Sequence, residues 1–576
     1  MCSIEGTTDK TVDIQKYTAF NKSRGPDGTD YFSDGWISLG HNYLAISPNP
    51  DNKTQPFVTP KGNVLLFNGE IYGLPEGTFD TEWLANYLDE NGIGGLKYDI
   101  NGMWAIAWYE PEKNRLTLCR DHFGVKPLYY SHRGDSFYFS STMRPLLATI
   151  EEKVEDDFGT RVWFHNDRFS SGSRTMWKDI GRVIPGGIIE YNLKQRRITA
   201  RDTLWGNNGD RFNLKPNHLW DEEEMEEIFI EAFNEVAYAP GIKKTISLSG
   251  GLDSTLIASL TKHQDNLSAS CVQWLGDAKV NDNDGTGWMD ESDYMLEYDL
   301  AVKTAKQYNL PVNTIKIKEK DAHKYNDEIQ FALSGQPHWD RNRTNPRYMN
   351  IMNAAKAGNR IYMCGDGADE LLTGYNGHFS ITENKAMIHG PNMIERFAKD
   401  SSKWRMIKTE FPTHLLSIDP INNYLFIRGL NELDSFCTVA DSFTGAFGME
   451  SRMPFLHQKL AKYLLKIPGA IKIDVPIKVA CKQFKKKVSR QKHKWFLSGH
   501  YKRLIRHDMG HHIPNHVKNK DKKVGFAHPW DSRGFDRNRT IGEADWEIQK
   551  EQVKYFDMNV DFKPKLKDNV KQFESQ

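Results

Sequence analysis

Cys2 follows the initiator methionine directly. We expect Met1 to be removed because cysteine is small, which leaves Cys2 with a free α-amino group. This amine has a reference pKa of about 7.7–8.0, so a useful fraction is neutral and can accept the thiol proton. The sequence therefore predicts a nucleophile and its general base within one residue. A buried cysteine without a catalytic role is the alternative, because many proteins begin with Met-Cys.

The segment SGGLDS, Ser249–Ser254, forms a second candidate site between an expected strand and an expected helix. Its glycines allow the backbone to close around a phosphate group, and the N-terminus of the helix offers N–H groups to an anion. No Gly-Lys-Ser/Thr follows, so the segment is not a Walker A loop. A tight turn alone would explain the glycines but not Ser249, Asp253 and Ser254. We therefore expect a phosphate site here.

Residues 1–200 have the pattern of a sheet-rich domain, in which short strands are separated by turn residues. Turn residues dominate Asn21–Asp30 and Ser47–Lys53, and one helical stretch stands out at Thr81–Asn91. The expected strands are Trp36–Leu39, Val64–Phe67, Trp104–Tyr109, Leu116–Arg120, Phe137–Ser140 and Ile188–Tyr191. A stretch rich in Gly, Asn and Asp near Asp202–Asn217 is the expected linker.

Beyond this linker, strands and helices alternate. Asp221 is expected to cap a helix whose first turn is acidic, which suits the positive end of the helix. The expected strands are Lys244–Leu248, Ser268–Leu275, Val312–Ile317 and Arg360–Cys364, and the expected helices are Thr255–Lys262, Tyr294–Tyr308 and Pro346–Ala357. This alternation predicts a parallel sheet covered by helices, with ligands at the carboxyl ends of the strands.

Three segments have unusual composition. Residues 277–291 are polar and are expected to form an insertion. Lys482–Arg506 is strongly basic. We favour a solvated helix face or a phosphate-facing wall for this stretch, with a nucleic-acid patch as the alternative. The polar residues 541–576 are expected to be a C-terminal appendage of unknown role.

The composition limits the function classes. A chain of 576 residues is too long for one hydrophobic core, and its apolar content of 39% is that of a globular protein. Lys plus Arg and Asp plus Glu number 76 each, so no net charge favours nucleic acid or a membrane. The six cysteines form no CxxC pair, and the first residues lack the apolar stretch of a signal peptide. A reducing, cytoplasmic setting is therefore expected.

The N-terminal part resembles the class II glutamine amidotransferases. The resemblance rests on Cys2 and on three segments that lie where the family carries very similar ones. These segments are RGPD at Arg24–Asp27, FNGEIY at Phe67–Tyr72 and DHFGVKPLY at Asp121–Tyr129. The resemblance implies that residues 1–205 form an N-terminal-nucleophile (Ntn) hydrolase domain with the αββα sandwich fold.

The same resemblance assigns the residues of a glutamine site. It implies that the Asn68 side-chain amide and the Gly69 N–H form the oxyanion hole. Thiolate attack on the amide of glutamine builds a tetrahedral oxyanion, which needs donors already in place. It also implies that Glu70 and Asp80 hold the ammonium group of glutamine. A type I′ hairpin turn is the alternative for the Asn-Gly pair.

Tyr43 is also assigned to the glutamine site, but it departs from the family, which usually has an arginine there that binds the carboxylate of glutamine. Three explanations are open. Glutamine binding is weak, a nearby cation such as Arg24 substitutes, or the amide donor is not free glutamine. We favour the first, because Glu70 and Asp80 are still present to hold the amino group.

The part beyond the linker resembles the synthetase domain of asparagine synthetases. SGGLDS is similar to the pyrophosphate-binding signature of enzymes that cleave ATP to AMP and pyrophosphate. CGDGADELLTGY at Cys364–Tyr375 resembles the family segment SGEGSDExxxGGY, and FGMESRMPFL at Phe447–Leu456 resembles GxEARxPFL. The resemblance implies a parallel-sheet α/β ATP-pyrophosphatase domain over residues 215–540. The implied ATP-binding residues are Leu248, Ser249, Gly250, Gly251, Asp253, Ser254 and Gly365.

Further roles follow from this second resemblance. Asp253 and Asp369 would bind the Mg²⁺ that neutralises the ATP phosphates, as hard oxygen ligands do. Asp366 takes the place of a glutamate that is expected to act as the base for ammonia attack. Lys523, in KVGF, would stabilise charge on the acyl-adenylate and its tetrahedral adduct. A surface charge is the alternative for this lysine.

The two resemblances cover roughly residues 2–535 and imply a glutamine-dependent asparagine synthetase. Cys2 would release ammonia from glutamine through a thioester, and the second domain would adenylate and amidate the side-chain carboxylate of aspartate. The ammonia would travel through an internal passage. The implied cofactors are ATP and Mg²⁺, and the implied partners are glutamine, aspartate and ATP, with a homodimer left open. The alternatives are another carboxylate acceptor, as in relatives that include β-lactam synthetases, or a non-catalytic protein on a decayed amidotransferase scaffold.

Overall fold

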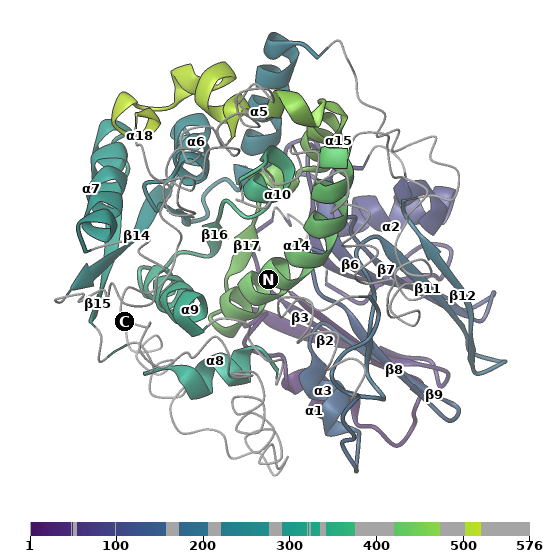
Figure 1. Cartoon of the computed structure of the whole chain (residues 1–576). Coiled ribbons are helices and arrows are strands. Elements are labelled where there is room, and N and C mark those ends of the chain that lie inside the picture. The colour runs from purple at the N-terminus through teal and green to yellow at the C-terminus, as the bar shows by residue number, and fades with distance from the viewer. Residues whose placement is uncertain are drawn as a thin grey trace, which may run out of the picture.

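The structure is a computed structural model, which describes residues 2–47, 49, 54–97, 100–156, 172–205, 220–275, 291–318, 321, 324–334, 341–374, 420–472 and 502–519. Lys523, residues 206–217 of the expected linker, residues 277–290 and residues 541–576 lie outside these ranges. Figure 1 shows two antiparallel sheets, formed by the purple and blue part of the chain, beside one parallel sheet.

The first third of the chain forms two six-stranded antiparallel sheets. Their strand orders are β10-β8-β9-β1-β3-β2 and β12-β11-β7-β6-β5-β4. The strands are β1 (Ser3–Thr7), β2 (Gly28–Ser33), β3 (Ser38–Tyr43), β4 (Phe57–Val58), β5 (Val64–Ile71), β6 (Gly102–Glu110), β7 (Arg115–Arg120), β8 (Tyr129–Arg133), β9 (Ser136–Ser140), β10 (Gly181–Arg182), β11 (Gly187–Asn192) and β12 (Arg197–Thr203). Alternate apolar side chains of both sheets, including Ile4, Leu66 and Phe139, form one buried core between them.

Helices cover the outer faces of the two sheets. Helices α1 (Ile14–Ala19) and α3 (Met143–Ala148) share a buried cluster with the first sheet. Helix α2 (Asp80–Asn91) and the 3₁₀ turn η1 (Ile93–Lys97) pack on the second sheet. The order of layers is therefore helix, sheet, sheet, helix, which confirms the expected αββα sandwich.

Most expected strands of this part are confirmed, as β3, β5, β6, β7, β9 and β11, and the expected helix is α2. Two expectations are wrong in detail. Strand β3 begins at Ser38 rather than at Trp36, whose side chain is 47% exposed. The end of the expected turn Asn21–Asp30 belongs to β2. Strands β2 and β12 are half exposed and mostly polar, so they lack the apolar run that identifies a strand in a sequence.

Residues 244–452 contain a five-stranded parallel sheet with the order β15-β14-β13-β16-β17. Its strands are β13 (Lys244–Ser247), β14 (Leu267–Leu275), β15 (Val312–Lys318), β16 (Ile361–Met363) and β17 (Glu450–Arg452). The chain adds β14 and β15 on one side of β13 and then β16 and β17 on the other. The switch point lies between β13 and β16, where open α/β sheets bind their ligands. The expected parallel sheet is confirmed.

Helices pack around the parallel sheet (Figure 1). They are α5 (Glu222–Ala237), α6 (Leu252–Thr261), α7 (Glu291–Gln307), α8 (Asn326–Ala332), α9 (Arg341–Lys356), α10 (Ala368–Leu372), α14 (Pro420–Ala446), α15 (Gln458–Lys466) and α18 (Asn515–Lys518), with short turns η5 (Pro454–Leu456), η6 (Gly469–Lys472), η7 (Leu504–Asp508) and η8 (Gly510–His512). Asp221 caps α5 as expected, because its carboxylate accepts a hydrogen bond from the Glu224 N–H at 2.9 Å. Pro346 was expected at the start of a helix, but it lies inside α9. Within the described ranges, no helix is long and apolar enough to cross a membrane.

Helix α14 joins the two parts of the molecule through buried ion pairs. Arg24 pairs with Asp441 at 2.7 Å, and Arg120 and Arg182 both pair with Asp434, at 2.8 and 2.5 Å. All five side chains are at most 8% exposed. Removing one partner of such a pair costs about 3–5 kcal/mol, because a charge stays buried without compensation. These pairs therefore hold the antiparallel sheets against the parallel-sheet part.

Candidate active sites

Cys2 lies at the start of β1, a central strand of the first sheet. Its Sγ accepts a hydrogen bond from the Leu44 N–H at 3.4 Å, and its carbonyl oxygen accepts one from Arg24 Nε at 3.3 Å. Burial raises the pKa of the Cys2 thiol to about 11, and the positive N-terminus and the Leu44 N–H offset this only in part. The thiol is therefore protonated at neutral pH and needs a nearby base to become a nucleophile.

Asn68 and Gly69 lie within β5, where they pair with Ala105 and Trp104 of β6. The hairpin-turn alternative for this Asn-Gly pair is therefore wrong. The Asn68 side chain is fully buried, and neither its amide nitrogen nor its oxygen has a hydrogen-bond partner among the described residues. A buried amide without a partner is costly, so it indicates a ligand group at this position.

The backbone around Gly69 is also arranged to reach a ligand. Phe67 donates its N–H to the Gln55 side chain at 2.6 Å, away from β6. N–H groups of alternate residues point to the same side of a strand, so the Gly69 N–H points to the same free edge. A Cβ on Gly69 would lie 2.0 Å from the Met103 carbonyl oxygen, so only glycine fits here. Asn68 and Gly69 together can supply two donors to an oxyanion.

Glu70 and Asp80 form a buried pair of carboxyl groups near Cys2. The Ser47 hydroxyl donates to Glu70 at 2.7 Å, and Arg452 reaches Glu70 from β17 at 3.2 Å. Asp80 Oδ2 has no hydrogen-bond partner in the described part of the chain. Burial, and then the negative charge of Glu70, raises the pKa of Asp80 well above its usual range. Glu450 pairs with the same Arg452 at 2.9 Å and with Lys126 at 3.0 Å, so the group holds three carboxyl groups and two cations. One negative charge stays without a cation, and an ammonium group would balance it.

Tyr43 is the last residue of β3. Burial raises the pKa of Tyr43, and Cys2, Asp80 and Glu70 raise it further, so its hydroxyl lies within their electrostatic range. Arg24 is only 2% exposed and is held by Asp441 at 2.7 Å. We therefore do not expect Arg24 to bind the glutamine carboxylate in place of the arginine that the family has at position 43. Binding a substrate carboxylate would break the buried pair of Arg24 with Asp441.

We predict that Tyr43→Arg lowers the glutamine KM by roughly 10- to 150-fold. A phenol donates one neutral hydrogen bond, whereas a guanidinium donates two charge-assisted ones. Such a bond contributes about 1.5–3 kcal/mol, which corresponds to this factor. Initial rates of glutamate release at varied glutamine would measure it, and ammonia-dependent synthesis should not change. A low-micromolar KM in the unmodified protein would contradict the idea of weak carboxylate binding.

The second candidate site lies where β13 ends. Ser249 and Ser254 face each other with their hydroxyl oxygens 3.2 Å apart, and the Gly251 N–H donates to Ser249 Oγ at 3.4 Å. Gly250 has φ +75°, and a Cβ there would lie 2.3 Å from the Glu297 carbonyl oxygen. The turn therefore requires glycine and leads directly into the N-terminus of α6. N–H groups of a first helical turn lack intrahelical partners and attract anions.

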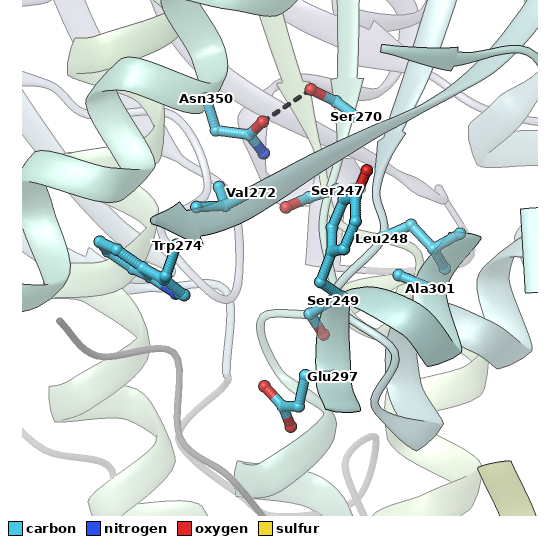
Figure 2. Close-up of a pocket in the computed structure, with 10 residues that line it drawn as sticks. Ser247, Leu248, Ser249, Ser270, Val272, Trp274, Glu297, Ala301 and Asn350 are labelled. Atoms are coloured by element: carbon cyan, nitrogen blue, oxygen red, sulfur yellow. Dashed lines mark hydrogen bonds between the residues drawn. The ribbon is translucent and has the colours of Figure 1, made fainter. Parts of the chain in front are cut away.

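A pocket opens beside this turn, between β14, α7 and α9 (Figure 2). It is lined by Ser247, Leu248, Ser249, Ser270, Val272, Trp274, Glu297, Tyr298, Ala301 and Asn350. Ser270 Oγ donates to Asn350 Oδ1 at 2.7 Å, as the dashed line in Figure 2 shows. Asn350 in turn donates to the Tyr362 hydroxyl at 3.0 Å, and Tyr362 donates to Ser247 at 2.8 Å. The pocket therefore combines the indole ring of Trp274 with small side chains and a wall of hydrogen-bonded polar groups. Such a lining suits a heteroaromatic ligand whose phosphates bind at the turn Ser249–Ser254.

The carboxylates of Asp253 and Asp369 meet at this edge of the parallel sheet. Asp253 is on the first turn of α6, and Asp369 is on α10, which follows β16 and Gly365. The Lys502 ammonium contacts both carboxylates, Asp369 at 2.6 Å, and its side chain is 3% exposed. Burial opposes the charge of Lys502, but the two carboxylates outweigh it and raise its pKa. The carboxylates of Asp253 and Asp369 thus converge closely enough to share one cation, the Lys502 ammonium. Carboxylate oxygens are the ligands that Mg²⁺ prefers, so this pair fits Mg²⁺.

Asp366 lies in the turn between β16 and α10. Arg347 of α9 forms an ion pair with it, and Cys364 Sγ donates to it at 3.3 Å. The Asp366 side chain is 22% exposed and that of Arg347 is 15% exposed. Asp366 is therefore accessible, but a guanidinium holds it in this structure.

The sequence analysis missed Lys502, Arg347 and the contact of Arg452 with Glu70. Lys502 belongs to the basic stretch, of which residues 482–501 lie outside the described ranges, so the expected phosphate-facing wall stays a prediction. Arg347 gave no signal, because its partner Asp366 lies 19 positions away on another element. Arg452 stands in the motif FGMESRMPFL, but that motif does not predict its pairing with Glu70. Lys523 lies outside the described residues, so its role stays a prediction.

Two family models match the chain. The glutamine amidotransferase domain matches residues 1–201, and asparagine synthase matches residues 243–560, which is more than half of the chain.

Curated relatives agree with these matches. Asparagine synthetase [glutamine-hydrolyzing] 2 of Bacillus subtilis is 23% identical, over 78% of this chain and 64% of the relative. Asparagine synthetase 1 of the same organism is 23% identical, over 91% and 85% of the two chains, and asparagine synthetase 3 is 29% identical, over 82% of each. The solved glutamine phosphoribosylpyrophosphate amidotransferase of B. subtilis covers 63% of this chain and 81% of its own at 11% identity, with a TM-score of 0.26. That superposition is too weak to carry a conclusion.

Proposed function

Because the chain belongs to the family of glutamine-hydrolysing asparagine synthetases, we propose that it transfers ammonia from glutamine to the side-chain carboxylate of aspartate. The observation that carries this proposal is the pairing of two separate sites. The first combines the Cys2 thiol, which lies within electrostatic range of Glu70, with a buried Asn68 amide that has no hydrogen-bond partner among the described residues. The second has the turn Ser249–Ser254 and two carboxylates that converge on Lys502. We propose that residues 1–205 form the glutamine amidotransferase domain and that residues 215–540 form the synthetase domain.

In the first half-reaction, the Cys2 thiolate attacks the side-chain amide of glutamine, and its own α-amine accepts the thiol proton. Asn68 and Gly69 donate hydrogen bonds to the oxyanion that forms. Glu70 and Asp80 bind the ammonium group of glutamine, which supplies the cation that this buried pair lacks. The oxyanion collapses to a thioester and breaks the C–N bond, and the leaving ammonia takes the proton back from the α-ammonium group. Water then hydrolyses the thioester to glutamate and frees the Cys2 thiol.

In the second half-reaction, the turn Ser249–Ser254 binds the phosphates of ATP through backbone N–H groups and hydroxyls. Asp253 and Asp369 would hold Mg²⁺, which neutralises phosphate charge when bound. Lys502 lies beside them and stabilises the charge of the departing pyrophosphate. The side-chain carboxylate of the substrate attacks the α-phosphate and expels this pyrophosphate, which leaves an acyl-adenylate. Ammonia then attacks the acyl carbon and displaces AMP, while Asp366, after exchange of its bond with Arg347, accepts a proton from the attacking ammonia.

The experiment that tests this proposal is turnover with glutamine, aspartate and ATP, followed by mass spectrometry and nucleotide chromatography. We expect glutamate, asparagine, AMP and pyrophosphate in equal amounts. ADP and phosphate would show that the phosphate turn works differently. AMP formation with another carboxylate but not with aspartate would keep the chemistry and change the acceptor.

We predict that Asp366→Asn slows amide formation by about 10²-fold and leaves adenylation largely intact. Proton removal by a positioned base contributes about 10²–10⁴-fold, and it occurs only after AMP is attached. Asparagine is suitable because it keeps a partner for Arg347, whereas alanine would leave that guanidinium unpaired. The measurement is exchange of labelled pyrophosphate into ATP beside asparagine formation. An equal loss in both assays would assign Asp366 to the nucleotide site.

A further inference from the structure

Glu226 of α5 meets two adjacent histidines at the end of η8. His511 Nε2 lies 2.9 Å and His512 Nε2 lies 2.7 Å from the same Glu226 oxygen, Oε1. The donor atoms of all three residues lie within 4.8 Å of one another. The two histidines lie 285 and 286 positions after Glu226 in the sequence. The three residues belong to neither candidate active site, so the mechanism above does not use them.

We propose that Glu226, His511 and His512 bind a divalent transition-metal ion of the Zn²⁺ type. Two imidazole nitrogens and one carboxylate oxygen form a ligand set that suits zinc and cobalt, whereas Mg²⁺ prefers oxygen ligands alone. Sites with three protein ligands keep a fourth position for water. The His511 side chain is 57% exposed, so solvent and a metal ion can reach the group.

The separations of the three donors fit such an ion after small side-chain rotations. Metal–nitrogen and metal–oxygen bonds of about 2.0–2.2 Å in a tetrahedron place the ligand atoms about 3.3 Å apart. The two imidazole–carboxylate separations are 2.9 and 2.7 Å, so each of these pairs needs to move apart by roughly half an ångström. The two imidazole nitrogens lie within 4.8 Å of each other. All three side chains are partly exposed, which leaves room for this movement.

The backbone that carries the histidines is already fixed. The Tyr308 hydroxyl of the neighbouring turn donates to the His512 carbonyl oxygen at 3.0 Å, and Thr304 Oγ1 lies 3.0 Å from His516 Nε2. Because this backbone is held by hydrogen bonds, binding an ion loses little conformational entropy, which favours binding.

Bound metal would join α5 to the segment 502–519. This segment, drawn in yellow-green in Figure 1, lies against α6 and begins with Lys502, which contacts Asp253 and Asp369. We therefore expect the ion to stabilise the segment that positions Lys502, rather than to take part in the reaction.

The test is titration of the untagged full-length protein with Co²⁺, in the presence of excess Mg²⁺. We expect visible d–d absorption bands that saturate at one equivalent and that Zn²⁺ abolishes. His512→Ala and the nearly isosteric Glu226→Gln should weaken Co²⁺ binding by about 10²-fold or more. Zn²⁺ should raise the thermal midpoint of the unmodified protein and not that of the variants.

His263→Ala is the matched control, because it removes an exposed histidine that lies outside the cluster. Its Co²⁺ spectrum should equal that of the unmodified protein. Far-ultraviolet circular dichroism shows whether each variant is folded. Absence of Co²⁺ binding, or an unchanged spectrum in Glu226→Gln and His512→Ala, would overturn the proposal and leave only a hydrogen-bonded His–Glu cluster.

Discussion

Cys2→Ala should abolish asparagine formation from glutamine and leave formation from ammonium salts unchanged. The substitution removes the attacking sulfur, so the glutamine-dependent rate should fall by about 10³-fold or more. The ammonia-dependent rate should persist, because Ser249–Ser254, Asp253 and Asp369 lie at the edge of the parallel sheet and Cys2 lies in the antiparallel part. Product quantification with each nitrogen source measures both rates.

Cys271→Ala is the matched control for this substitution. Cys271 is a buried cysteine of β14 with no assigned role, so its loss should leave both rates near normal. Among the described cysteines, only Cys2 is partly accessible, so a thiol-alkylating glutamine analogue should label it first. Loss of both activities in Cys2→Ala would contradict the separation of the two sites.

The buried strands and the glycine-rich turns could be predicted from the sequence, because each has a local signal. Val64–Phe67 is an apolar run at the start of β5, and SGGLDS combines glycines with hydroxyls and a carboxylate. Exposed edge strands such as Arg197–Thr203 could not be predicted, because their polar side chains resemble those of a loop. Pro346 also misled the prediction, since tertiary packing keeps α9 continuous through it.

The candidate site could be predicted where a single motif displays its residues, and it could not be predicted where a contact joins distant segments. Cys2, Asn68 and Asp253 stand in motifs that a single sequence displays. Lys502 is one of many lysines in a basic stretch, and only the fold brings it to Asp253, 249 positions away. Arg452 likewise reaches Glu70 only because the two parts of the chain pack against each other.

Asp369→Asn should suppress adenylation, and with it both glutamine- and ammonia-dependent synthesis, while glutamine hydrolysis continues. Charge stabilisation by a bound metal contributes several kcal/mol, so we expect losses of roughly 10²–10⁴-fold. Asp253→Asn should have a similar effect, because both carboxylates contact the same Lys502 ammonium. Pyrophosphate exchange into ATP measures the loss without contribution from the glutamine site.

Two explanations of such a loss must be separated, because these carboxylates could serve only as partners of Lys502. If Asp369 is a metal ligand, Asp369→Asn should raise the Mg²⁺ concentration needed for half-maximal exchange at fixed ATP. Lys502→Met should slow exchange with an unchanged Mg²⁺ requirement. Asp299→Asn removes an exposed carboxylate of α7 and should be normal in both respects. If Asp369→Asn and Lys502→Met show the same Mg²⁺ dependence as the unmodified protein, the metal site lies elsewhere, and the aspartates act through the lysine.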